Sequence, residues 1–252
     1  MDSAIPEVAG VLCLASPQQH TLAKMLAQAF MWQAYGRRRL IVVNSSGKPF
    51  QPVSTADIVV VDIPPATLGA MRNQAFNVLE NQCFRGWVTW VSTEVFDHPI
   101  RLLYQMAHRD INGRPSFLCY QVRFDINNQL VCVWQDPDGL PESLLLPFRP
   151  GLTCDPQLQP GESDLQLMKA FDKPLVLNNA PGSLAGPALQ LVRFRQGHDD
   201  AEEFFGQYSQ SHWRGTAPPG VTKSLLHEMA NVLHPYGLDL QAREETGDGH
   251  RS

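Results

Sequence analysis

The chain has 252 residues, a formal net charge of −5 and only 18% charged residues, which fits one large domain that can bury a sizeable core. This balance excludes a nucleic-acid-binding protein that relies on a basic field over its whole surface. The five cysteines stand singly, which excludes a disulfide framework or a zinc knuckle and predicts reduced, buried thiols at Cys13, Cys83, Cys119, Cys132 and Cys154.

Short apolar runs alternate with amphipathic segments from the start of the chain. Residues 10–15 (GVLCLA) have the composition of a strand buried on both faces. Apolar side chains then recur at helical spacing over residues 21–35, and Gly36 suits the end of that helix. A second buried strand is predicted at residues 40–43 (LIVV).

The same pattern continues up to residue 91. Residues 57–62 (DIVVVD) predict a third strand, and the two prolines that follow suit the first turn of a helix over residues 66–83. A fourth strand is predicted at residues 86–91 (GWVTWV). Apolar strands that alternate with helices indicate a mostly parallel sheet between two helical layers, so we predict a Rossmann-like three-layer α/β fold.

The pattern changes after the fourth strand. A helix is predicted over residues 98–110, with Asp97 as its N-cap. Alternating apolar residues over 116–126 and 130–134 predict an antiparallel hairpin, with a further strand at 143–146. The hairpin either extends the same sheet or forms a small separate sheet.

Proline and glycine are concentrated in residues 147–162, which is the composition of a linker. We therefore predict a Rossmann-like domain with the hairpin extension at residues 1–150, a C-terminal α+β extension packed on or beside it at residues 151–240, and a mobile tail at residues 241–252. The extension is expected to contain strands at residues 175–177 and 189–194 and helices at residues 201–209 and 222–233.

Ligands of open parallel sheets bind beyond the carboxyl ends of the strands. Four predicted loops meet at that edge, and their polar residues are the candidate ligand-binding side chains. These candidates are Ser16, Gln18, Asn44, Asp62 and Ser92.

Familiar reactive motifs are incomplete in this chain. Pro49 follows Gly47 and Lys48 where a phosphate-binding loop needs a hydroxyl for magnesium. Asn231 stands where the helix of a zinc protease needs its second histidine, and Ser183 lies one place early for a nucleophile elbow. We therefore predict no catalytic residue and no metal site.

Three stretches carry a family resemblance. Residues 11–15 match a first strand that leads into a cofactor loop, and residues 36–44 match the segment that leads into a second strand. Residues 57–65 match a strand that ends in Asp and is followed by proline. In this layout the chain resembles the SAM-dependent methyltransferase fold over about a third of its length, most nearly the ribose 2'-O RNA methyltransferases. The resemblance implies SAM as cofactor, held by Ser16, Gln18 and Asn44.

The same comparison implies Asp62 as the residue nearest the reacting group. Asn44, however, replaces the acidic residue that grips the cofactor ribose, and a glycine-free loop follows the first strand. Ser92 and Thr93 stand where a catalytic lysine is expected, so nothing eases deprotonation of a ribose hydroxyl.

A basic run provides the candidate nucleic-acid contacts. The run consists of Arg37, Arg38 and Arg39, with Lys48 further on, and Trp32 lies near it in the sequence. One interpretation is that these residues contact RNA through its phosphates and through base stacking. A solvated turn between helix and strand explains the same run.

A complete α/β pattern without a complete reactive constellation favours a non-catalytic module that binds another macromolecule, as a regulator, adaptor or structural component. This leading hypothesis needs no cofactor, leans away from an enzyme and expects a protein partner, with the oligomeric state open. The alternatives are a divergent SAM-dependent methyltransferase acting on RNA and an RNA-binding accessory protein. Without a basic leader or a long apolar stretch, we expect a cytoplasmic protein without a membrane partner.

Overall fold

The computed structural model describes residues 5–53, 57–93, 95–97, 99–125, 130–135, 143–157, 166–167, 169–171, 174–177, 191–194 and 213–216. The first half contains β1 (Glu7–Leu14), the short 3-10 helix η1 (Pro17–Gln19), α1 (His20–Met31), β2 (Arg38–Asn44), β3 (Ile58–Asp62), α2 (Leu68–Asn81) and β4 (Gly86–Val91). The second half contains β5 (Val95–Asp97), α3 (Arg101–Ala107), β6 (Ser116–Leu118), β7 (Tyr120–Asp125), β8 (Leu130–Gln135), β9 (Leu145–Pro147), β10 (Leu175–Leu177), β11 (Leu191–Phe194) and β12 (Trp213–Thr216).

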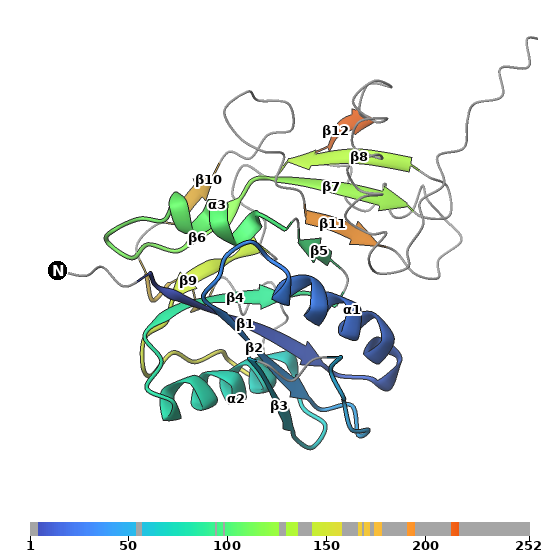
Figure 1. Ribbon diagram of the computed structural model, residues 1–252, viewed down its shortest axis with the longest axis vertical. Coiled ribbons are helices and arrows are strands. Elements are labelled where there is room, and N and C mark those ends of the chain that lie inside the picture. Colours follow the sequence, from blue (N-terminus) through green and yellow to red (C-terminus); the bar gives the residue numbers. More distant parts are fainter. Residues whose placement is uncertain are drawn as a thin grey trace, which may run out of the picture.

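The first sheet has the strand order β10-β6-β9-β4-β1-β2-β3. β1 pairs in parallel with both β2 and β4, and β2 pairs in parallel with β3. β9 runs antiparallel to β4 and β6. α1 and α2 lie on opposite faces of the parallel strands (Figure 1). The predicted three-layer, mostly parallel α/β fold is therefore confirmed.

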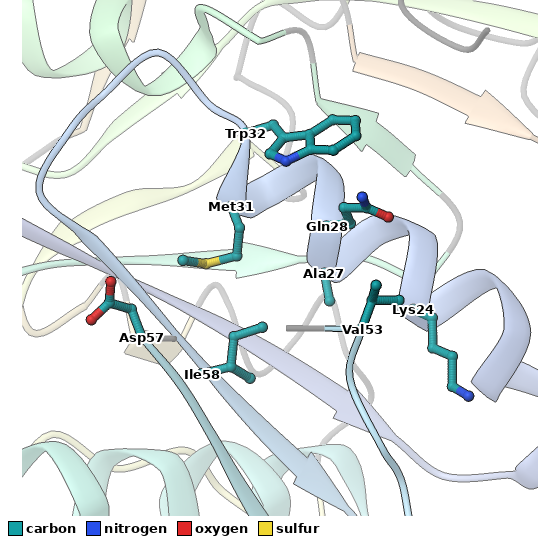
Figure 2. A pocket seen from close by; sticks show the side chains of 8 residues that line it. All are labelled: Lys24, Ala27, Gln28, Met31, Trp32, Val53, Asp57 and Ile58. Atoms are coloured by element: carbon teal, nitrogen blue, oxygen red, sulfur yellow. The ribbon is translucent and has the colours of Figure 1, made fainter. Parts of the chain in front are cut away.

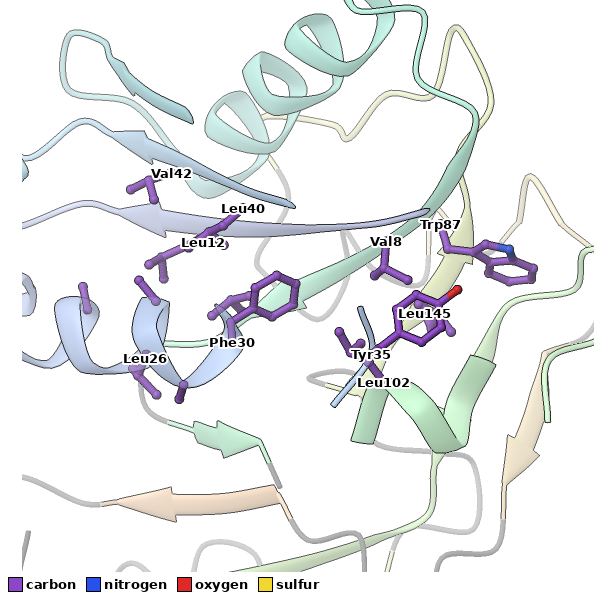
Figure 3. Packing of buried hydrophobic residues seen from close by; sticks show 14 of the residues in the cluster. Val8, Leu12, Leu26, Phe30, Tyr35, Leu40, Val42, Trp87, Leu102 and Leu145 are labelled. Carbon is purple, nitrogen blue, oxygen red and sulfur yellow. The ribbon is translucent and has the colours of Figure 1, made fainter. Parts of the chain in front are cut away.

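Side chains of each central strand alternate between two hydrophobic layers. Val8 and Leu12 of β1 belong to the cluster beneath α1, whereas Ala9 and Val11 belong to the cluster beneath α2. Figure 3 shows the α1 layer, in which Phe30 packs toward the strands. A period of two in a strand that is covered on both faces explains why the apolar runs are continuous in the sequence.

The hairpin of β7 and β8 forms a second sheet, with the order β12-β8-β7-β11-β5. This sheet lies beside α3 and apart from β1 to β3 (Figure 1), so the hairpin does not extend the first sheet. β10, from beyond residue 150, pairs with β6 in the first sheet. The division of the chain at residue 150 stays a prediction.

Two local predictions are wrong. The helix expected over residues 98–110 is α3, and Asp97 does not cap it, because the Asp97 carboxylate pairs with the buried guanidinium of Arg101. The thiol of Cys83 is exposed, whereas Cys119 and Cys154 are buried as expected and Cys13 is partly buried. The side chain of Cys132, the helices expected at 201–209 and 222–233, and the tail lie outside the described residues.

Within the described part of the chain, no helix has the length and apolar composition that a membrane crossing requires.

Gly10 sets the distance between α1 and the sheet. A Cβ atom at this position would lie 2.6 Å from Cζ of Phe30, closer than packed carbon atoms can approach. Gly10→Ala is therefore expected to lower the free energy of unfolding by about 1–3 kcal/mol, measured by urea denaturation. Gly36→Ala is the matched control, because a Cβ at Gly36 meets no atom within 4 Å.

The double variant Gly10→Ala with Phe30→Leu tests the cause. If the ring of Phe30 is the obstacle, the double variant loses less stability than the two single losses added together. Simple additivity of the two losses would contradict the packing explanation.

Candidate functional site

The parallel strands bring polar residues to one edge of the sheet. In the strand register Leu14 lies opposite Asn44, and Asn44 lies opposite Asp62. Residues at the carboxyl ends of β1, β2 and β3 are therefore neighbours, although 18 positions of sequence separate the last pair. This is the edge at which open α/β sheets bind ligands.

Asn44 is the centre of a hydrogen-bond network at this edge. Its Nδ2 donates to Oδ1 of Asp62 at 2.5 Å and to the carbonyl oxygen of Lys48 at 2.7 Å. Its Oδ1 accepts from Oγ of Ser46 at 2.7 Å. The Asn44 side chain is almost fully buried, while Asp62 is exposed, so the network fixes a carboxylate at the surface.

His20 extends the network to the first helix. Its Nε2 lies 2.9 Å from Oγ of Ser46, and its ring makes an edge contact with the buried ring of Phe50. His20 is the first residue of α1, so the network joins the start of that helix to the ends of β2 and β3. An imidazole and a carboxylate, two groups that can accept a proton, are thereby held at one edge.

Gln19 organises the loop after β1. Its Oε1 accepts from the backbone N–H groups of Ala15 and Ser16 at 2.9 and 3.1 Å, and its Nε2 donates to Oγ1 of Thr93 at 3.4 Å. Oγ of Ser16 in turn donates to Oε1 of Gln18 at 2.8 Å. The loops that follow β1 and β4 are therefore connected across the edge.

The structure brings the five candidate ligand-binding residues to the same edge, four of them in two hydrogen-bonded pairs. Asn44 and Asp62 share one network, and Ser16 and Gln18 share the other, while Ser92 follows β4 beside Thr93. Gln19, His20, Ser46 and Thr93 lie in the same predicted loops but were not among the five candidates chosen from the sequence. The spacing of Ser16 and Gln19 is that of a capping box and could have identified Gln19.

A buried arginine side chain lies beneath this edge of the sheet. The guanidinium of Arg72 in α2 stacks on the ring of Trp90 in β4, 4.1 Å from the ring centroid, and Arg72 is almost fully buried. Cys13, near the end of β1, has its pKa raised to about 12 by burial, an effect that the charge of Arg72 opposes. The Cys13 thiol is therefore neutral at physiological pH and unsuited to act as a nucleophile.

The four basic candidates for RNA contact do not form one patch. Arg38 and Arg39 open β2, whereas Lys48 follows its end, so a strand of seven residues, roughly 20 Å long, separates them. Each arginine also has an internal partner: Arg37 donates to the carbonyl of Ile5, Arg38 to that of Tyr35, and Arg39 pairs with Glu7.

A second polar network is buried below the loop that follows β4. Arg101 is 1% exposed, forms an ion pair with Asp97, and donates to Oγ1 of Thr89 at 2.7 Å and to Oε1 of Gln105 at 2.9 Å. The hydroxyl group of Thr89 in turn donates a hydrogen bond to the carbonyl oxygen of Leu144. The network therefore ties α3, β4 and the approach to β9 together, and it fixes the end of β5.

In the ranges that the structure describes, no group of three or more His, Cys, Asp or Glu side chains is arranged to hold a metal ion. The described residues of the edge thus provide hydrogen-bonding groups and the ionisable side chains of His20, Lys48 and Asp62, but no preformed metal centre.

No family model matches this chain, and no curated protein sequence matches it. Solved structures do resemble it. Residues 1–349 of TarS from S. aureus in complex with UDP align with a TM-score of 0.50 and 12% identity, covering 93% of this chain and 67% of that chain. The same fragment with UDP-GlcNAc gives 0.50, 11%, 93% and 68%. A longer TarS structure gives a TM-score of 0.51 at 11% identity, covering 91% of this chain and 43% of that chain.

At this identity the likeness shows only the fold, which this chain shares with the TarS structures. It overturns the leading hypothesis of a non-catalytic module that binds macromolecules. That hypothesis took the lack of familiar motifs as a sign of inactivity, yet this fold occurs in structures that hold UDP and UDP-GlcNAc. The methyltransferase and RNA-binding alternatives gain no support from these neighbours.

The ion pair of Arg101 and Asp97 can be tested by stability. Arg101→Met is expected to lower the free energy of unfolding by about 3–5 kcal/mol at neutral pH, because it leaves the carboxylate of Asp97 buried without its cation. The double variant Arg101→Met with Asp97→Asn should lose less. Arg85→Met, at an exposed arginine, is the matched control, and urea denaturation is the measurement. A loss no larger than that of the control would contradict the role of the pair.

Stability should also depend on pH through Asp97. Burial raises the pKa of Asp97 above its ordinary value, although the charge of Arg101 opposes the shift. The folded chain therefore keeps this proton over an interval in which the unfolded chain has lost it, and the free energy of unfolding contributed by Asp97 falls as pH rises through that interval, starting near pH 4. Asp97→Asn is expected to flatten this part of the profile of unfolding free energy against pH. A profile of unchanged slope would contradict the assignment.

Proposed function

We propose that this protein binds a nucleoside diphosphate sugar, with uridine diphosphate sugars as the first candidates, at the carboxyl edge of β1, β2 and β3, and that it acts in sugar transfer. The observation that carries the proposal is the network of His20, Ser46, Asn44 and Asp62 at that edge. The shared fold with TarS structures that contain UDP or UDP-GlcNAc supports the choice of ligand.

The network suits the nucleoside half of such a ligand. The exposed carboxylate of Asp62 has acceptor positions beyond the one that Asn44 occupies, so it can accept hydrogen bonds from ribose hydroxyls or from a base N–H group. Asn44 fixes the orientation of this carboxylate, because its own amide is buried and held by Ser46 and Lys48. Such preorganisation lowers the entropic cost of binding.

The diphosphate half would lie toward α1. The continuous helical stretch of η1 and α1 begins at the same edge, and the positive end of its dipole favours an anion there. The exposed Lys48 belongs to the loop after β2, where its backbone carbonyl accepts from Asn44. Its ammonium group is the natural partner for a phosphate oxygen.

Sugar transfer requires one bond to form and one to break. The oxygen of an acceptor hydroxyl attacks C1 of the sugar, the bond from C1 to the phosphate oxygen breaks, and the nucleoside diphosphate leaves with the electron pair. A base must take the hydroxyl proton. His20 and Asp62 are the ionisable side chains of the network and are the first candidates for this role.

Calorimetric titration of the full chain tests the proposal. Saturable binding of UDP or UDP-GlcNAc is expected, with no saturable binding of SAM. Asn44→Ala should weaken nucleotide binding by about tenfold or more, because it releases the carboxylate of Asp62 and unmakes a buried hydrogen bond. Asn81→Ala, at the exposed end of α2, is the matched control and should bind as the unaltered protein does.

A second measurement separates binding from transfer. Release of UDP from UDP-GlcNAc, followed with and without sugar acceptors, should fall in His20→Ala and Asp62→Asn and persist in Asn81→Ala. Failure of every nucleoside diphosphate to bind the folded full chain at millimolar concentration would refute the proposal.

A further inference from the structure

β3 is the last strand of the first sheet. It pairs with β2 on one side, and among the described strands none pairs with its other side. Its residues Ile58, Val59, Val60 and Val61 are all β-branched and only partly buried. It carries no lysine or proline, the residues with which proteins commonly protect a sheet edge from pairing.

An open groove of about 250 Å³ runs between α1 and this edge. Its floor and walls are mostly apolar, with Ala27, Met31, Val53 and Ile58 among the lining residues. Val53 is 68% exposed and Trp32 at the end of α1 is 50% exposed. The groove lies on the α1 face of the sheet, away from the hydrogen-bond network at the carboxyl edge.

Opposite charges mark the two ends of the groove. Figure 2 shows Lys24 of α1 at one end and Asp57, which precedes β3, at the other. Both side chains are exposed. Because α1 starts at the carboxyl edge, Lys24 lies toward the carboxyl end of β3 and Asp57 lies at its amino end.

We infer that this edge is the interface of a homodimer, in which the β3 strands of two copies pair in antiparallel register about a two-fold axis. Antiparallel pairing places the amino end of β3 in one copy beside the carboxyl end of β3 in the other. Lys24 of each copy then faces Asp57 of the other, so the surface is complementary to itself in charge, as a two-fold interface requires.

The same arrangement covers the apolar groove. A two-fold axis perpendicular to the sheet keeps both α1 helices on one face, where they flank the junction. The exposed side chains of Val53 and Trp32 from the two copies then lie over the paired strands. Backbone groups on the outer side of β3, with which no described strand pairs, gain hydrogen-bond partners, and such bonds are the main source of affinity when a strand is added to a sheet. This inference does not depend on the proposed function.

Analytical ultracentrifugation of the full chain across the micromolar range is the first test, and a concentration-dependent dimer is expected. Hydrogen exchange on the same samples should show that the amides of β3 become protected as the dimer forms. A chain that stays monomeric, with exchange at β3 independent of concentration, would overturn the inference, and that result would point to a strand from another protein as the occupant.

Charge variants locate the interface. Lys24→Glu is expected to raise the dimer dissociation constant roughly tenfold, because the change acts twice across the two-fold axis. Adding Asp57→Asn should restore part of the affinity by removing the repulsion, and asparagine tolerates the positive φ of 58° at this position. Lys169→Glu, an equal change of charge at an exposed site outside the groove, is the matched control.

Val53→Asp adds a test that does not rely on charge pairs. Val53 is too exposed for the substitution to threaten folding, and it should shift the equilibrium to monomer. A dimer whose dissociation constant responds to neither Lys24→Glu nor Val53→Asp would use another surface and would contradict the inference.

Discussion

The four central strands of the first sheet are parallel: β1 pairs with β2 and β4, and β2 pairs with β3. Each connection between parallel strands must therefore return the chain to the end of the sheet at which the previous strand began. The carboxyl ends of these strands therefore meet, whatever their separation in sequence. This constraint places Asn44 beside Asp62 and brings the start of α1 to the same edge. The hydrogen-bond network, the candidate nucleotide site and the position of the groove between α1 and β3 all depend on it.

The rest of the fold holds this edge in place. Gly10 lets the C-terminal end of α1 approach β1 closely through Phe30. The buried network of Arg101 anchors the segment after β4, whose Thr93 side chain contacts Gln19 across the edge. Polar groups that make all their hydrogen bonds inside a core restrict alternative packings. The buried network of Arg101 therefore favours one arrangement of the loops.

Motif tests do not decide the function, because they compare the chain with particular reactive patterns. The absence of a glycine-rich loop or of a paired histidine excludes those patterns and no others. Asn44 and Asp62 were nonetheless identified, because their positions directly after apolar strands follow from periodicity alone. The contact between His20 and Ser46 was not predicted, since it spans 26 positions and depends on how α1 packs on the sheet.

The sequence by itself determined the alternation of strands and helices up to Val91 and the burial of the central strands on both faces. It also determined which polar residues stand at the carboxyl ends of these strands. These properties are local and periodic, so a sequence pattern can show them. Only the tertiary structure decided that the hairpin joins a second sheet, that Asp97 neutralises Arg101 instead of capping α3, and that β3 lies at an edge. These outcomes depend on which distant segments pair, and pairing is set by the burial of whole faces, which no local pattern encodes.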